Sequence, residues 1–218
     1  NSLSCELYGS IELKDDLSKK YKNKDIRILD APCMGRCASA PVIEIGHYHL
    51  EKADLEKVDQ AIQNKCTKPI IPDYECFDDY INKGGYKAFE EIRNGKNKWY
   101  ENIIKADLRG LGGAGFRTAK KWELVSKEKG PRYLAVNGDE GEPGTFKDRH
   151  YLETEPHMFL EGVLMASFAV SAQKCFIYIR DEYPASLHII KKEILKLEEK
   201  NIISSNFIDV RRGAGAYI

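Results

Sequence analysis

Residues 109–122, RGLGGAGFRTAKKW, and residues 137–149, NGDEGEPGTFKDR, are the stretches that decide the fold of the larger part of this chain. The first contains a dense run of glycines and continues into a predicted helix. Such a run leaves a short arc of backbone without β-carbons, so a flat or phosphorylated ligand can lie directly on main-chain N–H groups. The second is a polar loop rich in carboxylates, which accept hydrogen bonds from sugar hydroxyls. Together the two loops indicate a nucleotide-like cofactor.

Each loop has a plainer interpretation when it is taken alone. The spacing from Gly110 to Gly115 matches GxGxxG, but that fingerprint follows a buried strand, and residues 99–108 look more helical than extended. A glycine-rich turn between two helices is the alternative. The acidic loop could be a solvated turn or a calcium loop, since Asn137 and Asp139 imitate the opening of one. The further oxygen ligand and the closing Glu of a calcium loop are missing at the expected spacing.

In combination the two stretches resemble the flavin-binding subunit shared by respiratory complex I, NAD-reducing hydrogenases and NAD-dependent formate dehydrogenases. That family has a GxGGAGF-x-T segment ending in Lys-Trp, then Asn-x-Asp-Glu-x-Glu-Pro-Gly, then Phe-Lys-Asp-Arg, and all three occur here in that order. The similarity continues through residues 178–183, YIRDEY, and residues 212–218, RGAGAYI, so that it covers roughly residues 75–218.

The resemblance implies an NAD-linked enzyme in which hydride passes between nicotinamide and FMN, and single electrons then pass to iron–sulfur clusters. This chemistry belongs to the cofactors, so no catalytic side-chain acid or base is expected. The implied FMN contacts are Gly110, Gly112, Lys121, Asn137, Asp139 and Glu140. The implied NADH contacts are Gly113, Ala114, Phe116, Glu142 and Tyr217.

Two of these side chains have an evident chemical use and also a plain structural one. Phe116 offers a ring face to a base or nicotinamide, and Lys121 offers a positive charge to a phosphate or reduced flavin. Core packing and a solvated helix face are the alternatives. Lys120 is the neighbouring candidate cation, and we prefer Lys121 because it directly precedes Trp122.

The glycine loop departs from the family at three positions, because Leu111, Arg117 and Ala119 stand where Arg, Pro and Gly are frequent. Leu111 removes a positive charge from the loop and Arg117 restores one nearby. A non-catalytic scaffold with decayed loops is therefore an alternative. The intact acidic loop argues against it.

Composition excludes several classes of protein. Lys plus Arg equals Asp plus Glu at 34 each in the 218 residues, so we expect no nucleic-acid partner. No apolar run approaches the ~20 residues of a membrane span, and no secretion signal is visible, so we expect a cytoplasmic protein without membrane insertion. Six cysteines without such a signal fit a reducing compartment and metal or redox use.

The chain is expected to be an incomplete piece that works with other subunits of a multi-subunit dehydrogenase. It begins with Asn1 and stops at a glycine-rich motif that, in the family, runs into Cys-Gly-Glu-Glu. A [4Fe–4S] cluster is expected in the missing C-terminal part. The β subunit of NAD-dependent formate dehydrogenase is the preferred relative, on the strength of residues 136–139, residues 180–184 and a fused cysteine domain. Complex I and NAD-reducing hydrogenase remain the alternatives.

The cysteine domain is recognised by Cys33-x-x-x-Cys37, which follows a predicted strand, with Cys5 upstream. Two thiolates on a glycine-containing loop can share an iron–sulfur cluster, while zinc or a structural pair are competing uses. Residues 5–66 resemble the thioredoxin-like [2Fe–2S] ferredoxin that accompanies the flavin-binding protein. The resemblance implies Cys5, Cys33 and Cys37 as cluster ligands, with a fourth cysteine immediately before Asn1.

We therefore predict an α/β chain: an N-terminal thioredoxin-like domain, then a Rossmann-like flavin-binding α/β domain that is incomplete at the C-terminus. The boundaries are 1–66 for the partial ferredoxin domain, 67–76 for a linker, and 77–218 for the FMN- and NADH-binding domain. In the first domain we expect a helix with Leu7, Ile11, Leu13 and Leu17 on one side, a strand at 26–29, a strand at 41–46 with a turn at Gly46-His47, and a helix behind Asp54.

In the second domain the apolar patterns predict helices at 80–92 and 99–108 and a strand at 132–136. Thr154 is expected to cap a helix that has Pro156 in its first turn and runs to about Val170. A buried strand at 174–179 and a helix with apolar positions from Leu187 to Leu197 follow. This alternation implies a parallel sheet with ligand loops at the carboxyl ends of its strands.

Overall fold

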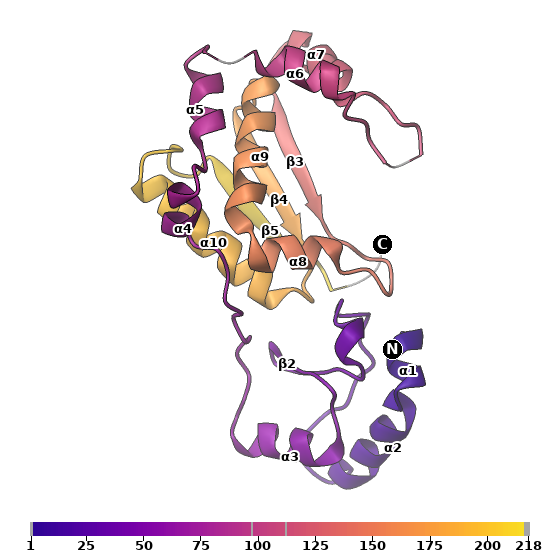
Figure 1. Cartoon of the computed structure of the whole chain (residues 1–218). Helices are drawn as coiled ribbons and strands as arrows, with labels where there is room; N and C mark the ends of the chain where they lie inside the picture. Colours follow the sequence, from indigo (N-terminus) through magenta and orange to yellow (C-terminus); the bar gives the residue numbers. More distant parts are fainter. Residues whose placement is uncertain (1, 97, 112, 216–218) are drawn as a thin grey trace.

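The computed structural model describes residues 2–96, 98–111 and 113–215 (Figure 1). The N-terminal part consists of α1 (Leu3–Leu7), α2 (Ser10–Tyr21), a 3-10 turn (Cys37–Ser39), β1 (Ile43–Ile45), β2 (Tyr48–Leu50) and α3 (Leu55–Gln63). The C-terminal part consists of α4 (Phe77–Asn82), α5 (Lys87–Arg93), α6 (Trp99–Ala106), α7 (Thr118–Lys127), β3 (Tyr133–Gly138), α8 (Lys147–Thr154), α9 (Pro156–Ala169), β4 (Lys174–Ile179), α10 (Pro184–Glu199) and β5 (Ile208–Arg212). In the described ranges no helix has the length and apolar character needed to cross a membrane.

The N-terminal helices pack through a narrower face than the sequence predicts. Gly9 adopts a left-handed φ of 84° and interrupts the helix between α1 and α2. As a result Leu7 and Ile11 are 75% and 50% exposed, and the predicted common face with Leu17 is wrong for these two residues. The face that is buried combines Leu17 with Tyr21, which lie one helical turn apart.

The predicted strand at 26–29 is wrong, whereas the hairpin after it is confirmed. In the described residues β1 pairs only with β2, antiparallel, around the turn at Gly46-His47. Residues 26–30 instead line a largely apolar cavity of about 850 Å³, whose lining also includes residues 41–46. Both segments therefore border one cavity, and no strand pairing joins them in the described residues. The helix behind Asp54 is confirmed, since the Asp54 carboxylate accepts the Lys57 N–H at 2.8 Å.

A parallel sheet with the strand order β3-β4-β5 organises the C-terminal part. The strands lie side by side in the same order as in the sequence. Right-handed crossovers therefore place α9 and α10 on the same face of the sheet, as Figure 1 shows. That face holds the core, which includes the fully buried Leu160, Leu164, Ile177, Ile179, Ile190 and Leu197. The predicted strands at 132–136 and 174–179 and the helix after them are confirmed. β5 was not predicted, because residues 208–212, IDVRR, are mostly polar.

The predicted helix at 80–92 is in fact two helices. The break falls at residues 83–86, where Gly84 and Tyr86 have φ values of 92° and 61°. Only a glycine fits at position 85, since an added Cβ would lie 2.1 Å from the Tyr80 ring. The buried Glu161 carboxylate of α9 then accepts the N–H groups of Tyr86 at 3.0 Å and Phe89 at 3.2 Å. It therefore takes the place of a local cap at the start of α5.

The acidic loop continues into a helix that the sequence did not predict, α8. Thr154 is its last residue and donates its hydroxyl to the His150 carbonyl at 2.7 Å, so the predicted capping of the next helix by Thr154 is wrong. The next helix, α9, begins at Pro156 as predicted. Residues 68–76 contain no helix or strand, and they are anchored where the Tyr74 hydroxyl donates to Glu193 at 2.6 Å. The domain boundaries proposed above remain predictions.

Replacing Glu161 by Leu is expected to lower the free energy of unfolding by roughly 2–4 kcal/mol, because two buried backbone N–H groups and the Tyr80 hydroxyl lose their acceptor. Denaturant unfolding followed by circular dichroism measures the loss. Glu90→Gln, on the exposed side of α5, is the matched control and should stay within ~0.5 kcal/mol of the parent. An unchanged midpoint for Glu161→Leu would show that this carboxylate does not hold α5 to α9.

Candidate functional site

A buried carboxylate, Glu140, organises the loop that follows β3. It accepts the backbone N–H groups of Asp148 at 2.9 Å and Arg149 at 3.1 Å, and the Tyr183 hydroxyl at 2.9 Å. The Lys147 ammonium lies 3.4 Å away. Burial raises the pKa of this carboxyl, but the two N–H bonds, the Tyr183 hydroxyl and the Lys147 charge together outweigh it and hold the pKa below its usual value. The side chain is therefore an anionic cap on the first turn of α8.

Glu140 thus has a role that the sequence did not reveal. An ionised carboxylate offers about four acceptor sites, and here the protein itself supplies four donors. Its backbone carbonyl also accepts the Arg180 guanidinium at 2.7 Å. The direct FMN contact implied for Glu140 remains a prediction, and the contacts seen are structural.

Asn137 and Asp139 open the same loop at the carboxyl end of β3. The Asn137 side-chain oxygen accepts the Asp139 N–H at 2.9 Å, which forms a local turn. Gly138 between them must be glycine, since an added Cβ would lie 2.9 Å from the Tyr178 carbonyl of β4. The Asn137 side chain is exposed and that of Asp139 partly exposed. Both can therefore present polar atoms to a ligand at this edge.

Glu142 contrasts with Glu140. It is exposed, and its backbone carbonyl accepts the N–H and the hydroxyl of Thr145 at 3.1 and 2.6 Å. Among the described residues, no hydrogen bond or ion pair involves its carboxylate. Glu142 is accordingly a loop carboxylate that remains available to a ligand.

A second charged segment closes the same edge after β4. The Arg180 guanidinium is buried and donates to Glu182 at 2.9 Å as well as to the Glu140 carbonyl. The sequence pointed to residues 178–183 only through the family resemblance and gave them no role. The available signal was a charged pair directly after a buried parallel strand, at the edge where such sheets bind ligands.

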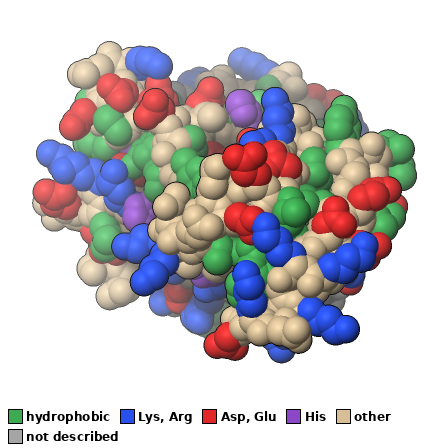
Figure 2. All heavy atoms as spheres, turned by 90° about the horizontal axis from the view of Figure 1, so that it is seen from below, with side chains coloured by type: hydrophobic (Ala, Val, Ile, Leu, Met, Phe, Trp, Pro, Cys, Tyr) green, Lys and Arg blue, Asp and Glu red, His purple; other side chains and the backbone are tan. Residues whose placement is uncertain are grey.

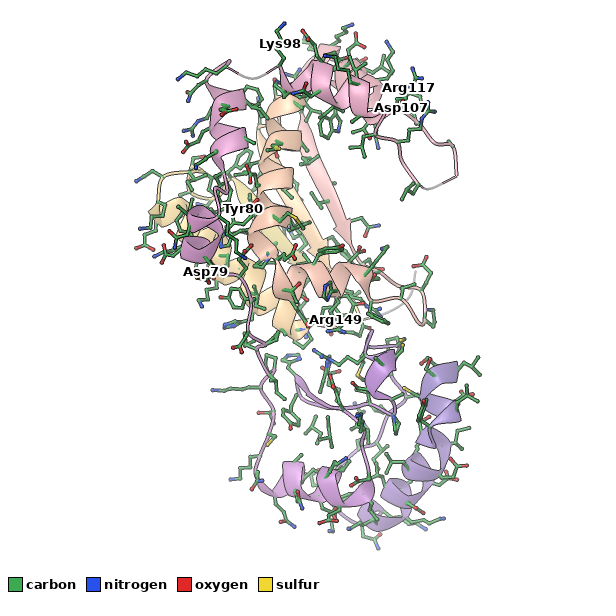
Figure 3. The ribbon with its side chains drawn as sticks, in the orientation of Figure 1. Asp79, Tyr80, Lys98, Asp107, Arg117 and Arg149 are labelled. Atoms are coloured by element: carbon green, nitrogen blue, oxygen red, sulfur yellow. The ribbon has the colours of Figure 1, made fainter. Side chains whose placement is uncertain are left out.

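The glycine loop is closed at its base by an ion cluster. Asp107, at the end of α6, pairs with Arg109 at 2.8 Å and with Arg117 at 2.9 Å. Figure 3 shows Asp107 and Arg117 next to each other there. Gly110 N–H donates to the Phe116 carbonyl at 3.0 Å, so the loop is pinned like a hairpin. A helix precedes it, which confirms that its glycines do not follow a buried strand.

The tip of the glycine loop is open to solvent. Leu111 is fully exposed, Phe116 is 51% exposed and Ala114 is exposed. An added Cβ at Gly113 or Gly115 would meet no described atom within 4 Å, so the main chain at these two glycines is accessible. Figure 1 shows this loop and the loop after β3 at opposite ends of β3, and no backbone hydrogen bond between described residues joins them.

The two adjacent lysines of α7 differ in their partners. The Lys120 ammonium pairs with Glu123 at 3.1 Å, whereas none of the ion pairs between described residues involves Lys121. This difference supports Lys121 as the cation that a ligand would meet. Gly112 and Tyr217, which the resemblance assigns to FMN and NADH, lie outside the described residues.

The cysteine loop brings together two of the predicted cluster ligands, Cys33 and Cys37. The sulfur atoms of Cys33 and Cys37 lie 3.6 Å apart. Two thiolates on one tetrahedral metal at ~2.3 Å would lie about 3.8 Å apart, so this pair fits one iron of a cluster. Cys5 lines the same cavity, but no three His, Cys, Asp or Glu side chains in the described ranges are placed to hold a metal ion. Cys5 is therefore near the pair without joining it.

The cysteine loop also touches the loop after β3. Burial raises the pKa of the Cys33 thiol, but hydrogen bonds from the backbone of Gly144 and Gly35 and from the side chains of Cys37 and Ser2 together outweigh this and hold the pKa below its usual value. Gly35 is packed against the C-terminal part, since an added Cβ would lie 2.5 Å from the Tyr183 hydroxyl oxygen. The cysteine pair and the polar loop therefore share one edge of the sheet.

Two known families match separate ranges of the chain. Residues 103–218 match the family described as the Nuo51 FMN-binding domain. Residues 1–65 match the family described as thioredoxin-like [2Fe–2S] ferredoxin. The expected fold class, a thioredoxin-like part followed by a Rossmann-like parallel sheet, is confirmed.

Similar proteins carry consistent names. One subunit of the NADH-quinone oxidoreductase of Aquifex aeolicus is 44% identical over 156 residues, which are 67% of this chain and 37% of that protein. The protein of the same name in Rickettsia bellii is 47% identical over 136 residues, 58% of this chain and 33% of that one. Crystal structures of an NAD⁺-reducing [NiFe]-hydrogenase, air-oxidised and H₂-reduced, match at TM-scores of 0.78 and 0.80 and 25% identity over 99% of this chain and 42% of theirs. The chain spans less than half the length of these relatives.

Gly35→Ala is expected to destabilise the protein by more than the ~1 kcal/mol that a left-handed backbone costs an alanine, because its Cβ also collides with Tyr183. Gly95→Ala is the matched control, since its φ of 67° nearly equals the 64° of Gly35 while no described atom lies within 4 Å of its Cβ. Thermal unfolding of both variants measures the difference. Equal losses for the two would show that Gly35 is not packed against Tyr183.

Proposed function

Since the chain belongs to the family described as the Nuo51 FMN-binding domain, we propose that it binds FMN and NADH and passes electrons from nicotinamide to iron–sulfur clusters. The observation that carries this proposal is the shared edge of the sheet, where the polar loop after β3 meets the cysteine pair. The proposed parts are residues 1–66 for the cluster, 67–76 as linker, and 77–218 for FMN and NADH.

The flavin is held, in this proposal, by the polar loop after β3 and by the glycine loop. Bound FMN supplies hydride acceptance from nicotinamide and release of single electrons. Asn137 and Asp139 offer partly exposed polar atoms to its hydroxyls, and Glu140 keeps their loop in place by capping α8. The open main chain of the glycine loop and the Lys121 ammonium suit a phosphate or a flat ring.

The nicotinamide nucleotide is assigned to the exposed side of the same loops. The half-exposed Phe116 ring offers a stacking face, beside Gly113 and Ala114. The carboxylate of Glu142 can accept hydrogen bonds from ribose hydroxyls. Tyr217 is assigned to the same ligand on the family resemblance.

The cluster is assigned to Cys33 and Cys37 as one pair, with Cys5 as a further ligand. The 3.6 Å between the first two sulfur atoms supports this assignment, as does the match of residues 1–65 to a [2Fe–2S] family. A [4Fe–4S] cluster, implied by the resemblance, would be the next electron carrier.

The partner subunits decide which substrate is coupled to NAD(H). Val136-Asn137-Gly138-Asp139, the segment from Arg180 to Pro184 and the fused cysteine domain favour the β subunit of a formate dehydrogenase. The names of the sequence relatives favour an NADH:quinone oxidoreductase as the second candidate. NAD⁺ reduction by the purified complex with formate supports the first candidate. Activity only with quinone or only with hydrogen overturns it.

Flavin absorbance tests the proposal at its first step. The full-length protein, reconstituted with FMN and freed of excess ligand, should show a flavin spectrum that NADH bleaches under anaerobic conditions. A protein that stays colourless, or a bound flavin that NADH fails to bleach, would instead support a non-catalytic scaffold.

Glu142→Gln is expected to raise KM for NADH while FMN stays bound, because the variant keeps the shape of the side chain but loses the charge that strengthens a hydrogen bond. The expected loss is roughly 1–3 kcal/mol in kcat/KM. Steady-state NADH oxidation with ferricyanide measures it, and Glu90→Gln serves as the control on a distant helix. Loss of FMN from Glu142→Gln with unchanged NADH kinetics in the residual holoenzyme would reverse the assignment of this carboxylate.

A further inference from the structure

Arg149, on the first turn of α8, reaches across to the cysteine loop. Its Nε donates to the carbonyl oxygen of Gly35 at 3.1 Å, and Gly35 lies between Cys33 and Cys37 in the chain. Figure 3 shows Arg149 at the junction of the two parts of the molecule. Tyr183, which follows β4 at the same edge, lies against this glycine, since an added Cβ at Gly35 would lie 2.5 Å from its hydroxyl oxygen. Two contacts from the sheet edge therefore hold the cysteine loop.

A buried carboxylate of α8 holds the guanidinium of Arg149 in place. Glu153, one helical turn later, accepts from Nη1 of Arg149 at 2.7 Å and is 4% exposed. Its other oxygen lies 3.5 Å from Arg36 and accepts the Ser186 hydroxyl at 3.4 Å. Since Arg36 belongs to the cysteine loop, Glu153 stands between two arginines that come from the two parts of the chain.

Arg36 is itself held within the N-terminal part. Its Nε donates to His49 at 2.7 Å, and its Nη1 pairs with Glu51 at 2.8 Å. The cysteine loop is therefore braced by Arg36 from its own side and by Arg149 from the sheet. Both arginine side chains are largely buried, so solvent screens their charges only weakly.

We propose that Arg149 is a positioning residue that seats the cysteine loop on the sheet edge and sets the reduction potential of the cluster held by Cys33 and Cys37. This inference rests on the cluster site proposed above. Reduction adds one electron and no proton to the cluster, so its negative charge rises by one. A fixed guanidinium next to the ligand loop favours that reduced form, because cluster potentials follow local charge and hydrogen bonds to sulfur.

Loss of Arg149 acts in one direction through two charge effects. Removing its charge disfavours the extra electron. Its loss also leaves the buried Glu153 carboxylate with one cation fewer, and this less compensated negative charge disfavours the extra electron again. Arg149→Gln is therefore expected to lower the potential. Arg149→Lys keeps the positive charge, so its reduction potential is expected to lie close to that of the wild type, although the guanidinium fork is lost.

The test is a redox titration of the full-length protein with dithionite, in which the paramagnetic signal of the reduced [2Fe–2S] cluster is followed. At the wild-type midpoint, Arg149→Gln should show a three- to tenfold lower ratio of reduced to oxidised cluster. At 59 mV per tenfold change for one electron, this ratio corresponds to a midpoint potential that is lower by about 30–60 mV. Arg93→Gln, an exposed charge on α5, is the matched control and should leave the ratio unchanged.

Each outcome supports or overturns the inference. Arg149→Gln that keeps its cluster at the wild-type potential overturns it and leaves the proposed function standing, as does an equal shift in Arg93→Gln. A wild-type protein without a [2Fe–2S] signal overturns the cluster site and this inference together. Arg149→Gln could also lose the cluster. In that case the positioning role is supported if Arg149→Lys keeps the cluster and both variants melt at the wild-type temperature. It is overturned if both variants are unfolded.

Discussion

The ionised carboxylate of Glu140 is the interaction on which the arrangement at the sheet edge depends. A buried anion is costly unless donors surround it, and here backbone N–H groups of α8, Lys147 and the Tyr183 hydroxyl do so. Capping α8 fixes the direction of that helix and so the place of Arg149. Tyr183 is in turn the surface against which Gly35 packs. One carboxylate thereby links the polar loop, the helix and the cysteine loop.

The parallel sheet gives this linkage its location. Strands β3 and β4 end at the same edge, so the loops after them meet there and carry the charged residues that the core cannot hold. The cysteine loop lies on that edge, while the glycine loop stands away from it at the other end of β3. The face of the N-terminal part in Figure 2 mixes both signs of charge, in keeping with the balanced composition and with contacts made by individual ion pairs.

Local signals in the sequence were sufficient for much of the fold. Strand 174–179 follows from an apolar run, and the start of α3 follows from Asp54, because both depend on neighbouring residues. The break at Gly84 was missed although its glycines were visible, since the cap comes from Glu161, far along the chain. The strand expected at 26–29 failed because strand formation needs a partner, which no local pattern guarantees. The roles of Glu140 and Arg149 are likewise set by contacts between distant segments.

The most direct test of this account is the ionisation of Glu140 itself. Carbon-13 NMR of glutamate side-chain carboxyls, assigned with Glu140→Gln, follows its titration in the folded protein. The account predicts a pKa below the ordinary value of about 4.3, since the N–H groups, the Tyr183 hydroxyl and the Lys147 charge together outweigh burial. The folded state would then lose this carboxylate's contribution only as the pH falls through the lowered pKa. A pKa above the ordinary value would mean a neutral buried acid, and would contradict an anionic cap at the base of the site.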